Sequence, residues 1–127
     1  MSRDATAARR SAYRRGRRGE GLALLWLRLR GYRILARDLR SPAGEIDIVA
    51  RRGRILAIIE VKARDATAAA IGAASARQRA RIVRAARLFV GRHPRLAHLT
   101  VRFDLMLVTA DGWPRHLTDA WRADDGA

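Results

Sequence analysis

A predicted β-hairpin near the middle of the chain constrains the fold more than any other feature. Apolar and polar side chains alternate in Glu45–Ala50 and again in Ile55–Lys62, and a short connection around Arg52-Gly53 separates the two segments. Alternation with a period of two is typical of strands, and a glycine-containing turn of this length joins antiparallel neighbours. The register of such a pair decides which side chains share a face, so it also decides where the charged residues meet.

The charged residues of this hairpin are predicted to fall on one face. A two-residue turn at Arg52-Gly53 pairs Glu45 with Glu60. Asp47 then lies diagonally from Glu60, at about 7–8 Å between backbones. Lys62 projects to the same side, because side chains two residues apart on a strand share a face. The other face is predicted to be core and consists of Ile46, Ile48, Ala50, Ile55, Ala57, Ile59 and Val61.

Three carboxylates and one amine at the end of a sheet favour a divalent cation. Buried unpaired charges are costly, and mutual repulsion raises the pKa values of neighbouring carboxylates. A cation between Asp47 and Glu60 relieves both costs, and oxygen ligands favour Mg²⁺ or Mn²⁺ over zinc. The alternative is a salt bridge from Lys62 to Glu60 or Glu45 at a solvated strand end. The hairpin alone leaves both interpretations open.

The rarity of two residue types adds weight to the cation hypothesis. Lys62 is the only lysine among 27 basic residues, and Glu20, Glu45 and Glu60 are the only glutamates among 12 acidic residues. Arginine cannot be deprotonated, whereas lysine is a compact ammonium whose pKa can be tuned. A position that keeps lysine in an arginine-rich chain is therefore a candidate for chemistry that needs an amine.

A helix is predicted over Arg17–Arg30, and it ends at Gly31, the residue type most common after a helix C-terminus. Its apolar positions form two stripes. The stripe predicted to be buried follows the spacing i, i+3, i+4, i+7 and consists of Leu22, Leu25, Trp26 and Leu29. The second stripe combines Glu20 with Leu24 and Leu27, which places the carboxylate at the edge of apolar surface.

Three further segments complete the predicted core. Gly31–Ala36 is predicted to be a strand that ends at the turn Ser41–Gly44, and Ala76–Val90 is predicted to be a second long helix. The Ala-rich residues 64–75, which connect the hairpin to this second helix, are predicted to be a loop or a weak helical turn. Thr100–Val108 is predicted to be the last strand, with one face formed by Val101, Phe103, Leu105 and Leu107.

The order of these elements, α-β-β-β-α-β, predicts an α/β (α+β) fold with a mixed central sheet flanked by helices. The tail, with Trp113-Pro114 and Trp121, is expected to close one end of the core. Residues 1–18 are rich in arginine without apolar periodicity and are predicted to form a basic, flexible arm. Residues 19–127 are then one domain, as a length of 127 residues suggests.

Composition excludes several classes of protein. The chain has no cysteine, which excludes disulfides, thiolate zinc sites and a cysteine nucleophile. The longest apolar run, Leu22–Leu27, is too short to span a bilayer, and no small-residue cleavage site follows it. We therefore expect a cytoplasmic protein without a membrane partner.

The net charge of +15 points to an anionic partner. Nucleic acid is favoured, because neutralisation of phosphates drives binding that is independent of sequence. Anionic membranes and acidic proteins are competing partners, and an arginine-biased genome would produce the same charge with no partner at all.

The motifs of the chain resemble those of the YraN family of predicted bacterial endonucleases. Asp47 followed by Glu60-Val61-Lys62 looks like the PD-(D/E)XK signature of restriction-endonuclease-like folds, although Ile46 replaces its proline. The closer resemblance is to YraN and covers nearly all of 19–121, with motifs in the right order. These motifs are Gly19-Glu20, Gly31-Tyr32, Gly44-Glu45-Ile46-Asp47, Glu60-Val61-Lys62-Ala63-Arg64 and Arg102-Phe103-Asp104. Arg77-Gln78 stands where Lys-Gln is common.

The resemblance implies a restriction-endonuclease-like core related to archaeal Holliday junction resolvases. It implies that Asp47 and Glu60 bind Mg²⁺ (or Mn²⁺) together with the Val61 carbonyl, and that the ion polarises the scissile phosphodiester. Lys62 would orient or activate the attacking water and offset charge on the phosphate. Glu20 would hold a metal water or a second ion. Glu45 is a weaker candidate for the site. In the alternative interpretation it has a structural role and forms a hydrogen bond to the turn that precedes its strand.

Other residues have supporting roles in this hypothesis. Gln78 is an amide on an otherwise apolar stripe with Ile82, Ala85 and Phe89, and a core amide bonded to backbone is its alternative interpretation. Arg77, Arg81 and Arg84 form a basic row suited to phosphates, and Arg64 joins them as a nucleic-acid-binding residue; solvated arginines are the alternative. Arg102 and Asp104 are expected to form a structural ion pair. The three histidines, His93, His98 and His116, are expected at the surface or in loops.

The leading hypothesis is a Mg²⁺-dependent DNA endonuclease that acts on branched or structured DNA. A non-catalytic nucleic-acid-binding protein with the same fold is its rival, and a basic accessory protein with an acidic protein partner is a third candidate. Symmetrical cleavage of a junction would also require a two-fold homodimer.

Overall fold

The computed structural model describes residues 20–63, 68–108 and 112–123, and for 68–75 it describes the backbone alone. The predicted arm 1–18 and Arg64 lie outside the described residues. A five-stranded mixed sheet runs through the molecule in the order β1-β2-β3-β4-β5. The strands are β1 (Arg33–Ser41), β2 (Gly44–Arg52), β3 (Ile55–Ala63), β4 (Thr100–Val108) and β5 (Arg115–Trp121).

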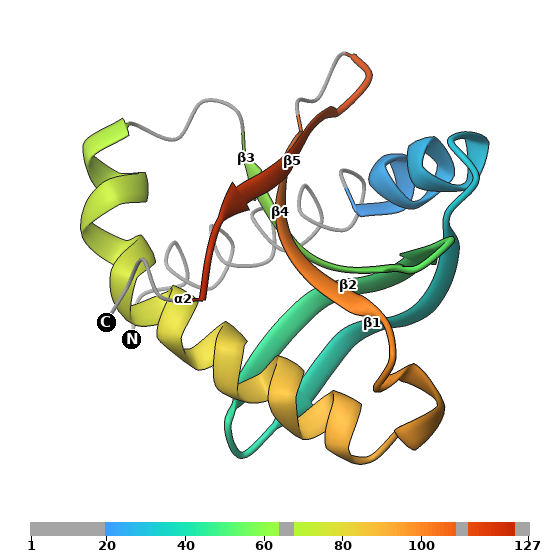
Figure 1. Cartoon of the computed structure of the whole chain (residues 1–127). Helices are drawn as coiled ribbons and strands as arrows, with labels where there is room; N and C mark the ends of the chain where they lie inside the picture. The colour runs from blue at the N-terminus through green and yellow to red at the C-terminus, as the bar shows by residue number, and fades with distance from the viewer. Residues whose placement is uncertain (1–19, 64–67, 109–111, 124–127) are drawn as a thin grey trace, which may run out of the picture.

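The connections follow from the strand directions. Antiparallel neighbours β1, β2 and β3 are joined by short turns, whereas β3 and β4 are parallel. A parallel pair needs a crossover, and the helix α2 (Ala68–Gly91) supplies it, followed by a short 3₁₀ helix at Pro94–Leu96. The N-terminal helix, residues 20–29, lies on the other side of the sheet from α2 (Figure 1).

Each face of the sheet is buried under one of the two helices. Ile58 of β3 packs in a cluster with Ile82, Ala85 and Phe89 of α2. Ile59, the next residue, packs in a second cluster with Leu24 and Leu27 of the N-terminal helix. The predicted α+β fold is confirmed, but the prediction that only one face of the hairpin is core is wrong. With helices on both sides, a central strand is apolar on both faces over most of its length.

The N-terminal helix ends as predicted and buries a different face. Tyr32 N–H donates to Leu27 O at 3.0 Å and Gly31 N–H to Arg28 O at 3.1 Å, with φ of 86° at Gly31. This is a Schellman motif, which favours glycine because of its positive φ. The predicted stripe is wrong, because Leu25 and Leu29 are 46% and 68% exposed. The core contacts come from Ala23, Leu24 and Leu27.

Three element boundaries also differ from prediction. β1 continues to Ser41, five residues beyond the predicted end of the strand. α2 begins at Ala68, within the segment predicted to be a loop or weak turn, because alanine-rich sequence has high helix propensity. The tail forms β5, which pairs antiparallel with β4, so the sheet has one strand more than predicted. Thr100–Val108 is a strand with the predicted bounds.

The register of the central hairpin differs from prediction by two positions. The turn residues are Gly53 and Arg54, with φ of 59° at Gly53, and Arg52 pairs with Ile55. From that pair the ladder runs to Ile48 opposite Ile59. A shift by two keeps the side chains of the paired residues on their predicted faces, because the side-chain period of a strand is two. It changes which charged residues are neighbours.

No helix among the described residues is both long and apolar enough to cross a membrane.

Candidate functional site

The candidate site is built where the β2–β3 ladder ends. The β2–β3 ladder ends at Ile48 opposite Ile59, so the residues that follow its last pair on the two strands are Asp47 and Glu60. Asp47 Oδ2 accepts a hydrogen bond from the Val61 N–H at 2.8 Å. Ile46 packs in the α2 cluster and Ile48 in the cluster of the N-terminal helix, so the alternation of β2 is interrupted at Asp47. The Asp47 carboxylate is thereby fixed against the backbone of β3.

Glu60 and Lys62 extend this site toward α2. Glu60 is only 5% exposed, and its Oε1 forms an ion pair with Lys62 Nζ at 3.1 Å, without hydrogen-bond geometry. The salt bridge of the alternative interpretation is therefore present, although Glu60 is buried and not at a solvated strand end. Lys62 Nζ donates instead to Gln78 Oε1 of α2 at 3.0 Å. The amide of Gln78 is therefore bonded by the lysine side chain, and its alternative interpretation as a core amide bonded to backbone is wrong. The prediction that Asp47, Glu60 and Lys62 come together is confirmed.

The charge of Asp47 is poorly compensated. Burial is the main cause that raises the pKa of this carboxyl above its ordinary value of 3.8, and repulsion from Glu60 and Asp38 adds to it. The Val61 N–H and the Lys62 ammonium oppose the shift but do not cancel it. A carboxylate in this state gains free energy from any cation that comes within reach.

Glu20, the first described residue of the N-terminal helix, shares this negative region. Its pKa is raised to about 7, chiefly by burial and then by the charge and hydrogen bond of Asp38, with a further contribution from Asp47. Its Oε1 is buried and has no hydrogen-bond partner among the described residues. The predicted link between the first helix and the hairpin acids therefore exists, although it runs through an additional carboxylate.

Asp38 is the member of the site that sequence reasoning missed. It lies on β1 between Arg37 and Leu39, where a polar residue on an edge strand attracts no notice. The structure gives it a φ of 49°, in the left-handed region that aspartate tolerates better than most residues. An arginine-rich strand that carries a single aspartate was the one available signal.

The donor set fits a hard divalent cation in its chemistry. All acidic donors are carboxylate oxygens, and two buried oxygens, one each on Glu20 and Glu60, have no hydrogen-bond partner in the described part of the chain. Among residues 20–63, 68–108 and 112–123, however, no three Asp, Glu or His side chains converge closely enough to form a finished metal cage. The arrangement is thus a pair of neighbouring acids, Asp47 and Glu60, with further carboxylates nearby.

Glu45 lies outside the cluster. Its side chain is 68% exposed and is paired with Arg40 at 3.8 Å, so the prediction that it opposes Glu60 is wrong. The corrected register explains the difference, because it no longer pairs Glu45 with Glu60. Gly44 just before it packs on α2: a Cβ there would lie 3.0 Å from the Arg81 carbonyl oxygen. The close approach brings the start of β2 against the helix that carries Gln78.

Three of the four arginines predicted to bind phosphates lie in the described part of the chain. Arg77, Arg81 and Arg84 all lie exposed on α2, the helix that contacts the site through Gln78. Arg64 lies outside the described residues.

A second charged network lies on β4 and β5. Asp104 is fully buried and accepts hydrogen bonds from Arg102 at 2.8 and 2.7 Å, from His116 at 2.8 Å and from the Asp119 N–H at 3.0 Å. Arg102 also donates to the Tyr32 hydroxyl at 2.6 Å. The predicted ion pair is confirmed. The prediction of a surface or loop position is wrong for His116, whose side chain is 3% exposed, whereas His93 and His98 are exposed.

The network stabilises the charge of Asp104. Burial alone would raise the pKa of this carboxyl, but the hydrogen bonds from His116, Arg102 and the Asp119 N–H together lower it below 3.8. The pKa of Arg102 is raised in turn, mainly by its hydrogen bonds to Asp104.

Comparison with known proteins gives consistent matches over most of the chain. Residues 19–108 match the model of the uncharacterised protein family UPF0102. A UPF0102 protein of Parvibaculum lavamentivorans is 56% identical over 112 residues, which cover 88% of this chain and 84% of that protein. One from Paramagnetospirillum magneticum is 52% identical over 92% of this chain and 94% of that protein. A third, from Methylorubrum extorquens, is 50% identical over 95% and 94%.

Proposed function

The chain belongs to the UPF0102 family, the YraN family to which its motifs pointed, and from this we propose that it is a metal-dependent DNA endonuclease. The reaction is hydrolysis of phosphodiester bonds with Mg²⁺ or Mn²⁺, and branched or otherwise structured DNA is the favoured substrate. The names of the relatives state no activity, so the proposal depends on the site itself.

One observation carries the proposal. Asp47 and the nearly buried Glu60 lie side by side, and the only lysine of the chain is held between Glu60 and Gln78. A purely structural pairing would neutralise the acids, yet the pKa of Asp47 remains raised and Glu60 Oε1 accepts no hydrogen bond from the described residues. An acid with a raised pKa beside a positioned amine is typical of catalytic sites.

Each residue of the site has a proposed role that follows from its position. Asp47 and Glu60 would hold the ion, with the Val61 carbonyl and Glu20 as further ligands. The ion, when bound, would polarise the phosphodiester and make water a better nucleophile. Lys62, fixed from two sides at 3.1 and 3.0 Å, would orient the attacking water and offset the charge that develops on the phosphate. Gln78 keeps the ammonium directed at this position.

The basic row on α2 is the proposed DNA contact. The helix that carries Gln78 also carries three exposed arginines, Arg77, Arg81 and Arg84. A DNA sugar-phosphate backbone bound along them would therefore pass close to the site. Each phosphate that an arginine neutralises contributes about 0.9 to the slope of log affinity against log salt. Replacing all three by alanine should therefore reduce the slope by up to about 3.

Cleavage assays test the proposal directly. The purified protein is incubated with four-way-junction and linear DNA of the same sequence, with Mg²⁺, with Mn²⁺ and with EDTA. We expect cleavage only with metal, with the junction preferred. Asp47→Asn and Lys62→Met should each abolish it, while DNA binding measured by anisotropy changes less than about twofold.

Glu45→Gln is the matched control, because it removes an acid from the same strand outside the cluster. Cleavage that persists in Asp47→Asn, or that disappears equally in Glu45→Gln, would contradict the assignment. If the junction is cut at symmetrical positions, sedimentation of the protein–DNA complex should show two protein chains per junction.

The non-catalytic alternative has one observation in its favour, namely the lack of a three-acid cage among the described residues. It predicts salt-sensitive DNA binding that is the same in Mg²⁺ and EDTA, with no cleavage. DNA binding that is insensitive to salt would count against both hypotheses and favour an acidic protein partner.

A further inference from the structure

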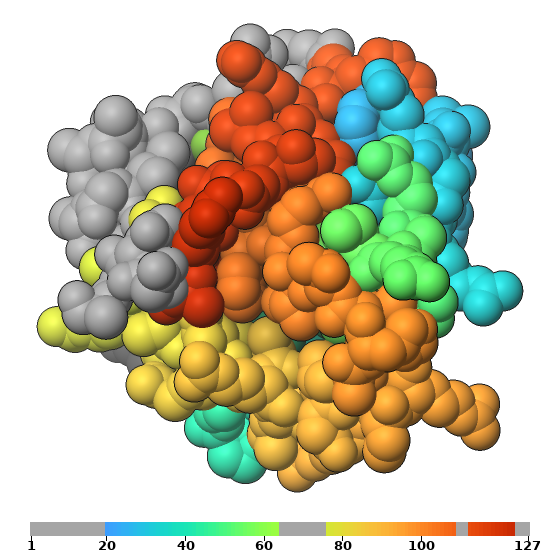
Figure 2. Space-filling view, in the orientation of Figure 1, coloured from blue at the N-terminus to red at the C-terminus, as the bar shows by residue number. Residues whose placement is uncertain are grey.

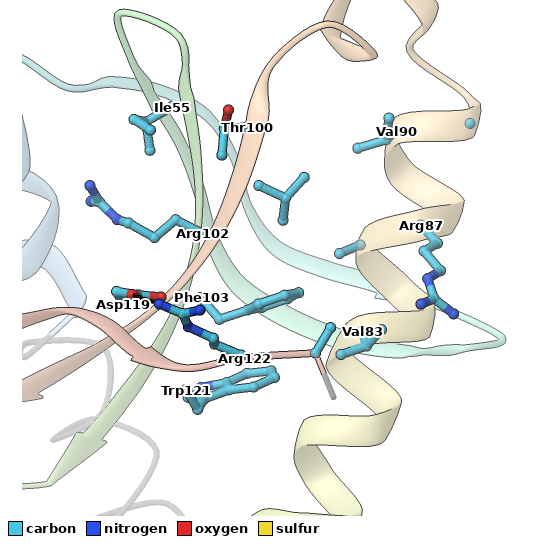
Figure 3. Close-up of a pocket in the computed structure, with 14 residues that line it drawn as sticks. Ile55, Val83, Arg87, Val90, Thr100, Arg102, Phe103, Asp119, Trp121 and Arg122 are labelled. Carbon is cyan, nitrogen blue, oxygen red and sulfur yellow. Dashed lines mark hydrogen bonds and ion pairs between the residues drawn. The ribbon is translucent and has the colours of Figure 1, made fainter. Parts of the chain in front are cut away.

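A groove separates the C-terminal half of α2 from β4 and β5. Figure 3 shows it between Val83 and Val90 on the helix and Phe103 and Trp121 on the strands. Its volume is about 820 Å³, within the range of sites that take small molecules. Figure 2 shows that parts of α2, β4 and β5 lie at the surface on one face of the molecule.

The groove combines an apolar floor with a basic rim. Val83, Ala86, Val90, Phe103 and Trp121 form most of the lining. Val101, which also lines it, is 39% exposed, and this is unusual for a valine on a central strand. At the rim lie Arg87 of α2 and Arg122 after β5, the latter paired with Asp119 at 3.4 Å. A neutral apolar occupant would gain nothing from this positive rim.

Trp121 supplies an independent sign of a polar occupant. The side chain is 4% exposed, its ring stacks on Phe103 with centroids 4.3 Å apart, and the Arg79 guanidinium lies 5.5 Å from the ring centroid. The Trp121 Nε1–H is buried and has no acceptor among the described residues. A buried donor without an acceptor is costly, so an occupant that brings an acceptor oxygen is favoured.

The groove is distinct from the acidic site. Gln78 reaches the site from the N-terminal half of α2, whereas Arg87 lies nine residues further on, roughly 14 Å along the helix axis. None of the acids of the site lines the groove, and Asp119 supplies the only carboxylate among the described residues that line it. The two therefore differ in the sign of their charge as well as in place.

We infer that this groove binds a small amphipathic organic anion. The apolar body of the ligand lies on Phe103 and Trp121, and its carboxylate, sulfonate or phosphate ester lies at the Arg87 rim. The positive rim at Arg87 favours an anionic group, the unbonded Trp121 Nε1–H favours a hydrogen-bond acceptor, and the apolar floor favours a hydrocarbon or aromatic body. Neither an inorganic anion nor a neutral oil meets all three of these conditions.

A fluorescent anion tests the inference on the full-length protein. The probe is 8-anilinonaphthalene-1-sulfonate, which has an aromatic body and one sulfonate. We expect saturable binding of one probe per chain, with displacement by octanoate. Octanol should displace it at least roughly tenfold more weakly because it lacks the charge, and acetate should not displace it because it lacks the body.

Two matched pairs of variants locate the binding. Arg87→Glu should weaken probe binding roughly tenfold, because attraction becomes repulsion, whereas Arg84→Glu, an exposed arginine one turn away, should change it less than about twofold. Val101→Ser in the groove should weaken binding, and Leu25→Ser, exposed elsewhere, should not. Melting temperatures confirm that all four variants fold.

Several results would overturn the inference. These are equal effects of the two arginine variants, equal displacement by octanol and octanoate, and loss of probe binding in Leu25→Ser. Probe binding that falls as protein concentration rises, with dimers in sedimentation, would assign the groove to a second copy of the chain. Cleavage of DNA plays no part in the readout, so the inference and the proposed function fail independently.

Discussion

The neighbouring parallel strands β3 and β4 carry the same charge pattern with opposite consequences. Each has an acid and a base two residues apart, Glu60 with Lys62 and Arg102 with Asp104. Both oxygens of Asp104 accept hydrogen bonds, and its pKa is lowered. Glu60 Oε1 accepts none from the described residues, and its neighbour Asp47 has a raised pKa.

The difference separates stabilisation from function. A buried carboxylate that is fully bonded contributes to the specificity and stability of the fold, and nothing is left for a ligand. A buried carboxylate that is incompletely bonded costs stability and keeps its capacity to bind a cation. The β2–β3 site is of the second kind and the Asp104 network of the first.

The largest effect is expected for Asp104→Asn. The amide keeps the shape of the side chain but leaves Arg102, whose side chain is 17% exposed, without its counter-charge. Removing one partner of a buried ion pair typically costs about 3–5 kcal/mol, a large part of the stability of a small domain. Urea unfolding followed by tryptophan fluorescence measures the loss.

His116→Phe is the graded control, because it keeps a ring at this position, removes one hydrogen bond to Asp104 and leaves the Arg102 pair in place. It should cost less than Asp104→Asn. A loss below about 1 kcal/mol for Asp104→Asn would show that the network contributes little, and the contrast between the two strands would fail.

Acidification should remove the same contribution without a mutation. The fold lowers the pKa of Asp104, which Arg102 faces from its own strand and His116 and Asp119 face from β5. The stabilisation is therefore complete above the ordinary pKa of 3.8, begins to decline as the pH falls below it, and is lost as the pH passes the lowered pKa. NMR titration of the Asp104 carboxyl carbon should show a midpoint below 3.8, and a midpoint above 3.8 would contradict the argument.

The sequence pattern was sufficient to predict those elements for which it is compatible with only one structure. Thr100–Val108 forms a strand with the predicted bounds, and Gly31 caps its helix as predicted. Asp47, Glu60 and Lys62 come together as predicted, because a register shift of two residues leaves the faces of the paired residues unchanged. The candidate site was thus predictable because its main residues belong to one local hairpin.

Features that depend on contacts distant in sequence were not predictable. The N-terminal helix has two apolar stripes, and only packing on β2 and β3 decides that Leu24 is buried and Leu29 exposed. The burial of His116 depends on β5, a strand that pairs with β4 around a bulge. Asp38 of β1 interacts with Glu20 of the N-terminal helix and raises the pKa of Glu20. This contact joins two different elements, so the sequence pattern of neither element predicts it.

A smaller effect of opposite sign is expected for Asp47→Asn. Burial and the nearby acids raise the pKa of Asp47, so its ionised form is less stable in the folded chain than in the unfolded chain. Removing the charge should therefore stabilise the protein at pH 7 in EDTA, by up to about 1 kcal/mol. The asparagine oxygen can still accept from the Val61 N–H.

Addition of Mg²⁺ should make the wild type more stable than Asp47→Asn, the reverse of the order expected in EDTA. An ion that binds only the folded wild type raises its melting temperature, whereas the variant has lost a ligand and should respond less. Melting curves of both proteins with and without Mg²⁺ make the comparison. If Asp47→Asn is destabilising in EDTA by more than about 1 kcal/mol, the carboxylate is structural like Asp104, and the distinction between the strands disappears.

The smallest effect is expected for Glu45→Gln, which tests whether position alone decides the role of a glutamate. Glu45 precedes Asp47 by only two residues on the same strand, yet it is 68% exposed and the Arg40 guanidinium with which it pairs is 3.8 Å away. Exposed pairs of this kind contribute about 0–1 kcal/mol, and the long distance favours the lower end. The unfolding free energy and the rise in melting temperature with Mg²⁺ should therefore match the wild type. A weaker response to Mg²⁺ would mean that the ion draws Glu45 inward, and the site would then extend to the exposed end of β2.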